Sequence, residues 1–121
     1  MKYSLFLYLL LAASNAFSLK PEKDYPATPA QYNLSYQEVR IRTKDGVRLN
    51  AWVYQTDSTQ RNPVTIILAG GDAGNMSYLI SYAAGLLSAG YRVVSFDYRG
   101  FGQSDDFQIS EDHLYYNEFH Y

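Results

Sequence analysis

The sequence predicts an α/β fold in which an antiparallel hairpin leads into a parallel strand, helix, strand unit. Two observations carry this prediction. Segments 39–44 and 47–54 alternate in polarity on either side of Asp45-Gly46, and an Asp-Gly pair between two such segments indicates a tight hairpin. Segments 64–69 and 91–97 then read as strands around a helical pattern, which is the arrangement of a right-handed parallel crossover.

The hairpin prediction rests on a period of two. Every second residue of segment 39–44 is basic, and every odd-numbered residue of segment 47–54 is apolar. Strict alternation of this kind is typical of a strand with one face toward the core and one toward solvent.

The crossover prediction rests on a change of pattern. Segment 64–69 is a continuous, largely β-branched apolar run after Pro63, as expected of a strand buried on both faces. A glycine-rich turn follows, and apolar residues then recur at helical spacing up to Gly90. Ser77 is the candidate N-cap of that helix, and Gly90 is its candidate stop.

Composition limits the classes of function. The chain has 121 residues, of which 47% are hydrophobic and 18% charged, which suits one globular unit. A net charge of -2 without a basic stripe argues against nucleic acid as a partner. Cysteine is absent and there are two histidines, so disulfides and thiolate chemistry are excluded and neither a metal site nor a cofactor is expected.

The N-terminus has the layout of a signal peptide. Lys2 precedes an apolar run that ends at Ala13, and small residues follow, with cleavage expected after Ala16 or Ser18. The run is shorter than the about 20 residues that a membrane-spanning helix needs, so no stable membrane span is expected. We therefore expect a secreted or periplasmic protein with a signal peptide at 1–18, a proline-rich linker at 19–35 and a folded domain at 36–121.

Two glycine-rich segments resemble motifs of the α/β-hydrolase superfamily. Segment 96–104 resembles the D-x-R-G-x-G-x-S segment after the fourth strand of that fold, and segment 68–77 is similar to the H-G-N-A-G-N loop after its third strand. The second motif belongs to the serine-aminopeptidase-like and monoglyceride-lipase-like branch. The resemblance covers about 35–121 and corresponds to the N-terminal portion of the fold.

The resemblance implies a role for each segment. In the family, the loop after the third strand supplies a backbone N–H of the oxyanion hole, which corresponds here to Gly71 and Asp72. Two departures stand out: the family's histidine is Gly70 in this chain, and Asp72 brings a carboxylate to the loop. The other segment is interpreted as an architectural loop motif, and its residues are Asp97, Arg99, Gly100, Gly102 and Ser104.

No catalytic residue is expected in this chain. A serine hydrolase needs a G-x-S-x-G elbow followed by an acid and a histidine, and segment 102–106 lacks the second glycine of an elbow. His113 and His120 are interpreted as surface residues, and the acids around them as a solvated face.

Two functions remain open. The first is an exported serine hydrolase that cleaves ester or amide bonds through an acyl-enzyme, present as a fragment that ends before the nucleophile elbow, lacks the catalytic triad and is inactive alone. Its substrate would be a small-molecule ester, a lipid or a peptide. The alternative is a non-catalytic secreted binding or scaffold module derived from the same fold.

Overall fold

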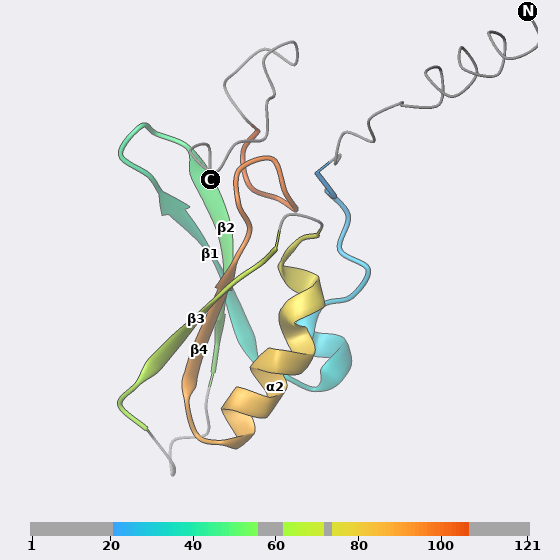
Figure 1. Ribbon diagram of the computed structural model, residues 1–121, viewed down its shortest axis with the longest axis vertical. Coiled ribbons are helices and arrows are strands. Elements are labelled where there is room, and N and C mark those ends of the chain that lie inside the picture. The colour runs from blue at the N-terminus through green and yellow to red at the C-terminus, as the bar shows by residue number, and fades with distance from the viewer. Residues whose placement is uncertain (1–20, 56–61, 72–73, 107–121) are drawn as a thin grey trace, which may run out of the picture.

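The structure is a computed structural model that describes residues 21–55, 62–71 and 74–106. Its four strands form a single mixed sheet in the order β1-β2-β4-β3, with an α-helix between β3 and β4 (Figure 1). The elements are η1 (Pro29–Tyr32), β1 (Tyr36–Arg42), β2 (Arg48–Tyr54), β3 (Thr65–Ala69), η2 (Met76–Leu79), α2 (Ile80–Ser88) and β4 (Arg92–Phe96). The predicted signal peptide and segment 107–121 lie outside the described residues.

The strand directions confirm the predicted fold. β1 and β2 pair antiparallel as a hairpin, β2 and β4 also pair antiparallel, and β3 and β4 pair parallel. The hairpin turns at Asp45-Gly46, as predicted, and Gly46 has a φ of 89°, which a residue with a side chain rarely adopts. Its N–H donates to the carbonyl oxygen of Thr43 at 3.0 Å.

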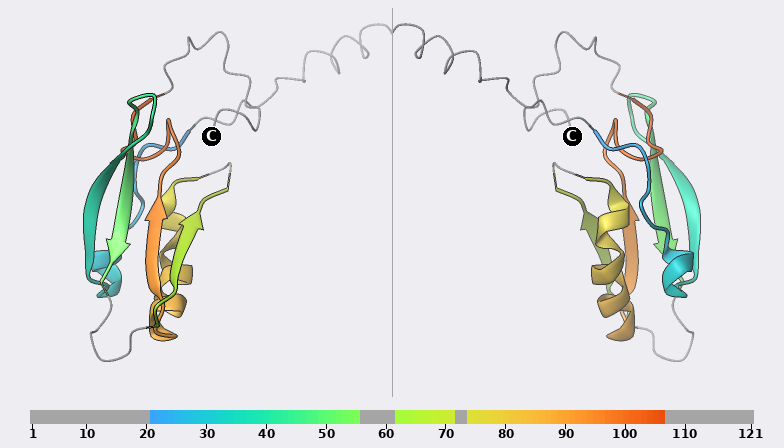
Figure 2. Two further views of the ribbon diagram at one scale, coloured as in Figure 1. Left: turned by 90° about the vertical axis from the view of Figure 1, so that its left-hand side faces the viewer. Right: turned by 90° about the vertical axis from the view of Figure 1, so that its right-hand side faces the viewer.

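The core lies between the sheet and α2, which covers one face of the sheet (Figure 2). Trp52 is its largest fully buried side chain, with ring centroids 5.0 Å from Tyr25 and 5.6 Å from Tyr36. Aromatic pairs at such distances add to the free energy that burial alone supplies. The buried cluster consists of Trp52, Tyr54, Met76, Ile80, Ala83 and Val93.

Burial along β3 differs from the prediction. We expected this strand to be buried on both faces, but Ile67 is 67% exposed. Leu68, whose side chain points to the opposite face, packs against the core cluster. In the described part of the chain the α2 face is thus covered and the Ile67 face is open, which apolar composition alone does not distinguish.

The described part of the expected linker packs against the domain. We call residues 22–25 the strap. The carbonyl oxygen of Glu22 accepts the Gly102 N–H at 2.8 Å, and the carbonyl oxygen of Asp24 accepts the side-chain amide of Asn75 at 2.6 Å. The strap therefore connects the segments that follow β3 and β4.

Candidate functional site

The candidate site lies where β3 and β4 end. Because these strands are parallel, the loops that follow them leave the same edge of the sheet, which is where ligands bind in open α/β sheets. We call segment 70–75 the β3 loop and segment 97–105 the β4 loop. Both lie at the same end of the molecule as the strap (Figure 1).

Asp97 connects the two loops. Its side chain is 1% exposed. One carboxylate oxygen, Oδ1, accepts the backbone N–H of Met76 at 2.7 Å, and Oδ2 accepts a hydrogen bond from the Tyr25 hydroxyl. Burial raises the pKa of Asp97, although hydrogen bonds from Tyr25, Met76 and the Gln103 backbone act in the opposite direction. The acid that ends β4 thus holds the residue at which the β3 loop enters η2.

Tyr25 lies at the centre of the polar network around Asp97. Its hydroxyl donates to Asp97 and accepts from the Asn50 side-chain amide at 2.9 Å and from the Gln103 N–H at 3.1 Å. Burial, followed by the bond to Asp97, raises the pKa of Tyr25, so the phenol is protonated at neutral pH and can donate. One hydroxyl therefore joins the strap, β2 and the β4 loop.

Asn75 ends the β3 loop and caps η2. Its side-chain oxygen accepts the Ser77 N–H at 3.1 Å and the Ser77 hydroxyl at 2.5 Å, while its amide donates to the strap. The predicted N-cap at Ser77 was therefore wrong by two residues. A 3₁₀ turn precedes α2, so the chain becomes helical earlier than apolar spacing indicated.

The β4 loop needs its two glycines. Gly100 has a φ of 83° and Gly102 a φ of 48°. A Cβ on Gly102 would overlap the Asp97 carboxylate and the Tyr25 hydroxyl, so the loop passes against the network without room for a side chain. Ser104 is buried, and its hydroxyl donates to the Asp97 carbonyl oxygen and accepts the Asn50 N–H, both at 2.8 Å.

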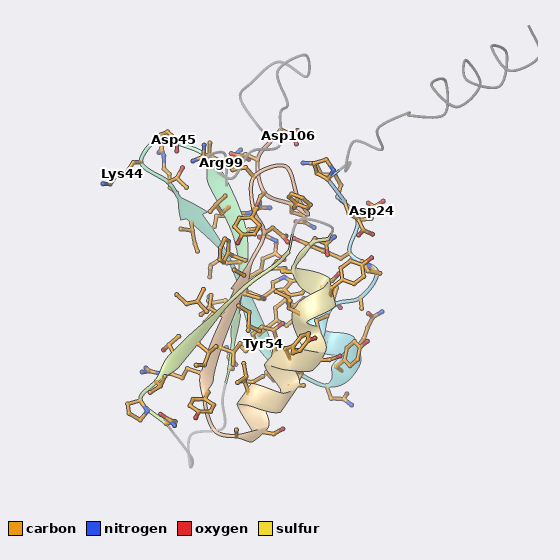
Figure 3. The ribbon with its side chains drawn as sticks, in the orientation of Figure 1. Asp24, Lys44, Asp45, Tyr54, Arg99 and Asp106 are labelled. Carbon is orange, nitrogen blue, oxygen red and sulfur yellow. The ribbon has the colours of Figure 1, made fainter. Side chains whose placement is uncertain are left out.

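The β4 loop is also joined to the hairpin by ion pairs. Arg99 forms two hydrogen bonds with Asp45 in the hairpin turn, one of them 2.8 Å long, and the two side chains meet at that end of the molecule (Figure 3). The Arg99 guanidinium, with the Thr43 hydroxyl, holds the pKa of Asp45 at about 2. Asp105 pairs with Arg48 of β2 at 3.1 Å.

Of the two residues implied as oxyanion-hole donors, the structure describes Gly71 only. Gly71 is exposed, and among the described residues, its chain neighbours aside, no atom lies within 4 Å of the position that a Cβ would take. Asp72 lies outside the described residues. The backbone of Gly71 is thus accessible to a ligand on the side where other residues carry a side chain.

Sequence reasoning missed three residues of the network. Tyr25 stands among prolines, and nothing in its surroundings indicated a buried partner. Asn50 occupies a position of β2 that alternation assigns to the wet face, yet it is fully buried. Asn75 followed a run of glycines and was interpreted as part of a flexible turn.

The acids near the end of the described chain are engaged in ion pairs. Asp106 pairs with Lys23 of the strap, and Asp105 pairs with Arg48. Across 21–55, 62–71 and 74–106, no group of three His, Asp or Glu side chains is arranged to hold a metal ion. His113 and His120 lie outside these residues. Within the same residues, no helix is long and apolar enough to cross a membrane.

Known proteins resemble this chain in sequence and in structure. It is 33% identical over 103 residues to the alpha/beta hydrolase domain-containing protein WAV2 of Arabidopsis thaliana, a match that covers 76% of this chain and 33% of WAV2. It is 31% identical over 96 residues to the protein bem46 of Schizosaccharomyces pombe, covering 78% of this chain and 31% of bem46. No family model matches it.

The solved structure of the Pyrococcus furiosus esterase Pf2001 superimposes with a TM-score of 0.59 at 27% identity, covering 73% of this chain and 33% of the esterase. This chain therefore spans about a third of the length of the proteins it matches. The mixed sheet, the order of its strands and these relatives together place the chain in the α/β-hydrolase superfamily.

Proposed function

We propose that this chain forms the oxyanion-loop side of a serine hydrolase that cleaves ester or amide bonds through an acyl-enzyme. The nucleophile, the acid and the histidine of the triad would come from a later segment of the protein, and residues 1–121 alone would be inactive. A small-molecule ester, a lipid or a peptide would be the substrate. The esterase among the structural relatives supports the ester as the first substrate class to test.

The chemical argument concerns where negative charge develops. Attack of a serine on a carbonyl carbon leaves charge on the carbonyl oxygen, and fixed N–H groups that point at this oxygen lower the barrier. Removal of one such donor in a comparable site costs about 2.7–4 kcal/mol. The exposed backbone at Gly71 offers an approach for that oxygen without any side-chain chemistry in the loop.

The single observation that carries this proposal is the hydrogen bond from the Met76 N–H to Asp97. It fixes the end of the β3 loop to the β4 loop by a buried carboxylate, and a donor must be held before the reaction if it is to stabilise a transition state. The start of any helix needs partners for its N–H groups, and what links this one to the proposed function is its place directly after the β3 loop.

A fluorophosphonate probe tests the proposal because it reacts with activated serines. The 121-residue chain should remain unlabelled, and the protein expressed from its complete gene should take up one probe on a serine outside residues 1–121. Heat-denatured protein is the control for nonspecific labelling. Stoichiometric labelling of Ser77, Ser95 or Ser104 would contradict the proposal, and absence of labelling in both proteins would favour the binding or scaffold module.

We also propose that the protein is exported and loses residues 1–16 or 1–18. The support is the charged start, the short apolar run and the small residues that follow it. The measurement is the mass of the protein recovered from the medium or the periplasm. A mature N-terminus at Phe17 or Leu19 is expected, and recovery of the exported protein with an intact Met1 would contradict cleavage.

A further inference from the structure

We propose that Tyr25 of the strap is a positioning residue for the oxyanion loop, acting through the hydrogen bond that its hydroxyl donates to Asp97. This inference rests on the proposed function and extends it. It assigns a task in that site to a residue about 45 positions before the β3 loop, in a segment whose composition indicated a linker.

The first step of the argument is geometric. The Asp97 carboxylate has one oxygen on the Tyr25 hydroxyl and the other on the Met76 N–H. The carboxyl group is planar, so a rotation that displaces one oxygen displaces the other. Tyr25 therefore restricts the orientation in which Asp97 receives Met76.

The second step concerns the number of bonds that depend on the hydroxyl. It donates once and accepts twice, from the amides of Asn50 and Gln103, which uses its full hydrogen-bonding capacity. Loss of the hydroxyl would leave a carboxylate oxygen and two N–H groups without this partner, in surroundings where Asp97 and Asn50 are almost fully buried. Water replaces such bonds poorly in a site of this kind.

The third step concerns the hydrogen bonds that the backbone of the strap accepts from the two loops. The Asn75 amide donates to the Asp24 carbonyl oxygen, next to Tyr25, and the Gly102 N–H donates to Glu22. The strap thus contacts both Asn75 of the β3 loop and Gly102 of the β4 loop. A shift of the strap would move both loops that border the site.

The chemical consequence is a loss of transition-state stabilisation without a loss of substrate binding. Oxyanion donors act on charge that forms during the reaction, so a loop held less firmly lowers kcat and leaves KM nearly unchanged. Misplacement by about 1 Å can cost on the order of 100-fold in rate. Because the Met76 anchor itself remains in Tyr25→Phe, we expect a smaller effect, a decrease in kcat of about tenfold.

The test compares Tyr25→Phe with Tyr78→Phe in the protein expressed from its complete gene. Both variants lose one tyrosine hydroxyl that forms a hydrogen bond between the strap and another part of the chain. The Tyr78 hydroxyl bonds the Glu22 carboxylate at 3.2 Å and does not contact Asp97. Rates on an activated ester are divided by the concentration of active sites, which fluorophosphonate titration provides. A residue that only stabilises the fold would change Tm and the number of active sites, but not kcat per site.

The value of kcat is also measured for Asp97→Asn and for the double variant that combines Tyr25→Phe with Asp97→Asn. If Tyr25 acts through Asp97, the effects of Tyr25→Phe and Asp97→Asn on kcat should be strongly non-additive, because the same anchor is already disturbed in either single variant. Tyr78→Phe should leave kcat as in the wild type. A kcat per site in Tyr25→Phe equal to the wild type, or fully additive effects in the double variant, would overturn the inference.

Amide hydrogen exchange gives a readout that does not depend on activity. Tyr25→Phe should accelerate exchange of the Met76 and Gln103 amides by tenfold or more, while the amides in the middle of the β1 and β2 pair keep their protection. Unchanged exchange at Met76 would overturn the inference even if the protein is an active hydrolase. Faster exchange in a protein without any hydrolase activity would instead show that the proposed function has failed and that Tyr25 only orders the loop.

Discussion

The Asp97 carboxylate, directly after β4, lies 2.7 Å from the backbone nitrogen of Met76, and it joins the β4 loop to the start of η2, which follows the β3 loop. Asp97 continues the series of buried residues Val93 and Ser95 in β4, and Val93 packs in the core cluster with Met76. The resemblance placed Asp97 in an architectural loop motif. In the structure, the partner of its carboxylate is the Met76 N–H. The same carboxylate meets the strap through Tyr25.

Gly102→Ala should destabilise the protein by about 2–4 kcal/mol. Alanine would have to adopt the left-handed backbone conformation of this position, and its Cβ would overlap Asp97. Gly85→Ala is the matched control. Gly85 lies within α2 with open space around it, so the same change there should stabilise by about 0.5–1 kcal/mol. Urea denaturation measures both, and equal effects of the two changes would contradict the packing described for the β4 loop.

Asn75→Asp separates the two tasks of the Asn75 side chain. Aspartate keeps the oxygen that caps η2 but replaces the amide donor with an acceptor facing the Asp24 carbonyl oxygen. We expect a loss of about 1–3 kcal/mol in unfolding free energy, with the helix content by circular dichroism unchanged. Asn75→Ala should lose both contacts. A stability of Asn75→Asp equal to the wild type would show that the bond to the strap contributes nothing.

Trp52→Ala should cost about 3–5 kcal/mol, as expected for the removal of a fully buried aromatic side chain. Tyr82→Ala on the solvent face of α2 is the control, because Tyr82 is 69% exposed and surface changes usually stay within about 0.5 kcal/mol. Thermal or urea unfolding followed by circular dichroism gives both values. A change below 1 kcal/mol for Trp52→Ala would contradict the position of the core.

The pKa of Asp45 should lie below the usual value of 3.8, and the pKa of Asp97 should lie above it. Asp45 is held at a pKa of about 2 by Arg99, so its contribution to stability is present above pH 3.8 and is lost as the pH falls toward 2. Burial raises the pKa of Asp97, so its contribution is present below pH 3.8 and is lost as the pH rises through the folded-state value.

Carboxyl carbon NMR shifts measure both midpoints. Arg99→Gln should raise the Asp45 midpoint and leave that of Asp97 in place, since Arg99 pairs with Asp45. An Asp97 midpoint at or below 3.8 would show that hydrogen bonds from Tyr25 and Met76 outweigh the burial of this carboxylate.

The fold was largely predictable because it depends on periodic patterns. Alternation around Asp45-Gly46 identified the hairpin, and the change from a period of two to helical spacing identified the crossover. The prediction for β3 was less successful, because an apolar run such as 64–69 shows that a strand can be buried but not which face is covered. That depends on which elements pack against it, and in the described chain Ile67 faces away from α2.

Apart from the loop motif whose resemblance marked Asp97, Arg99 and Ser104, the candidate site was predictable only where glycine reveals backbone conformation. Gly100 and Gly102 indicated a tight turn, and both have positive φ. The network around Asp97 was not predictable, because its members come from segments far apart in the chain and each has an ordinary local context. Tyr25 and Asn50 meet through tertiary packing, and no local pattern records such a contact.

The most direct test of the account is a crystal structure of the protein expressed from its complete gene after reaction with a small alkyl fluorophosphonate. The phosphorus would be bonded to a serine outside residues 1–121, and its phosphoryl oxygen would stand where the charged oxygen of the tetrahedral intermediate would be. We predict that this oxygen accepts a hydrogen bond from a backbone N–H of the β3 loop, at Gly71 or Asp72, at about 2.7–3.1 Å. A phosphoryl oxygen that points away from this loop and bonds donors elsewhere would contradict the central claim.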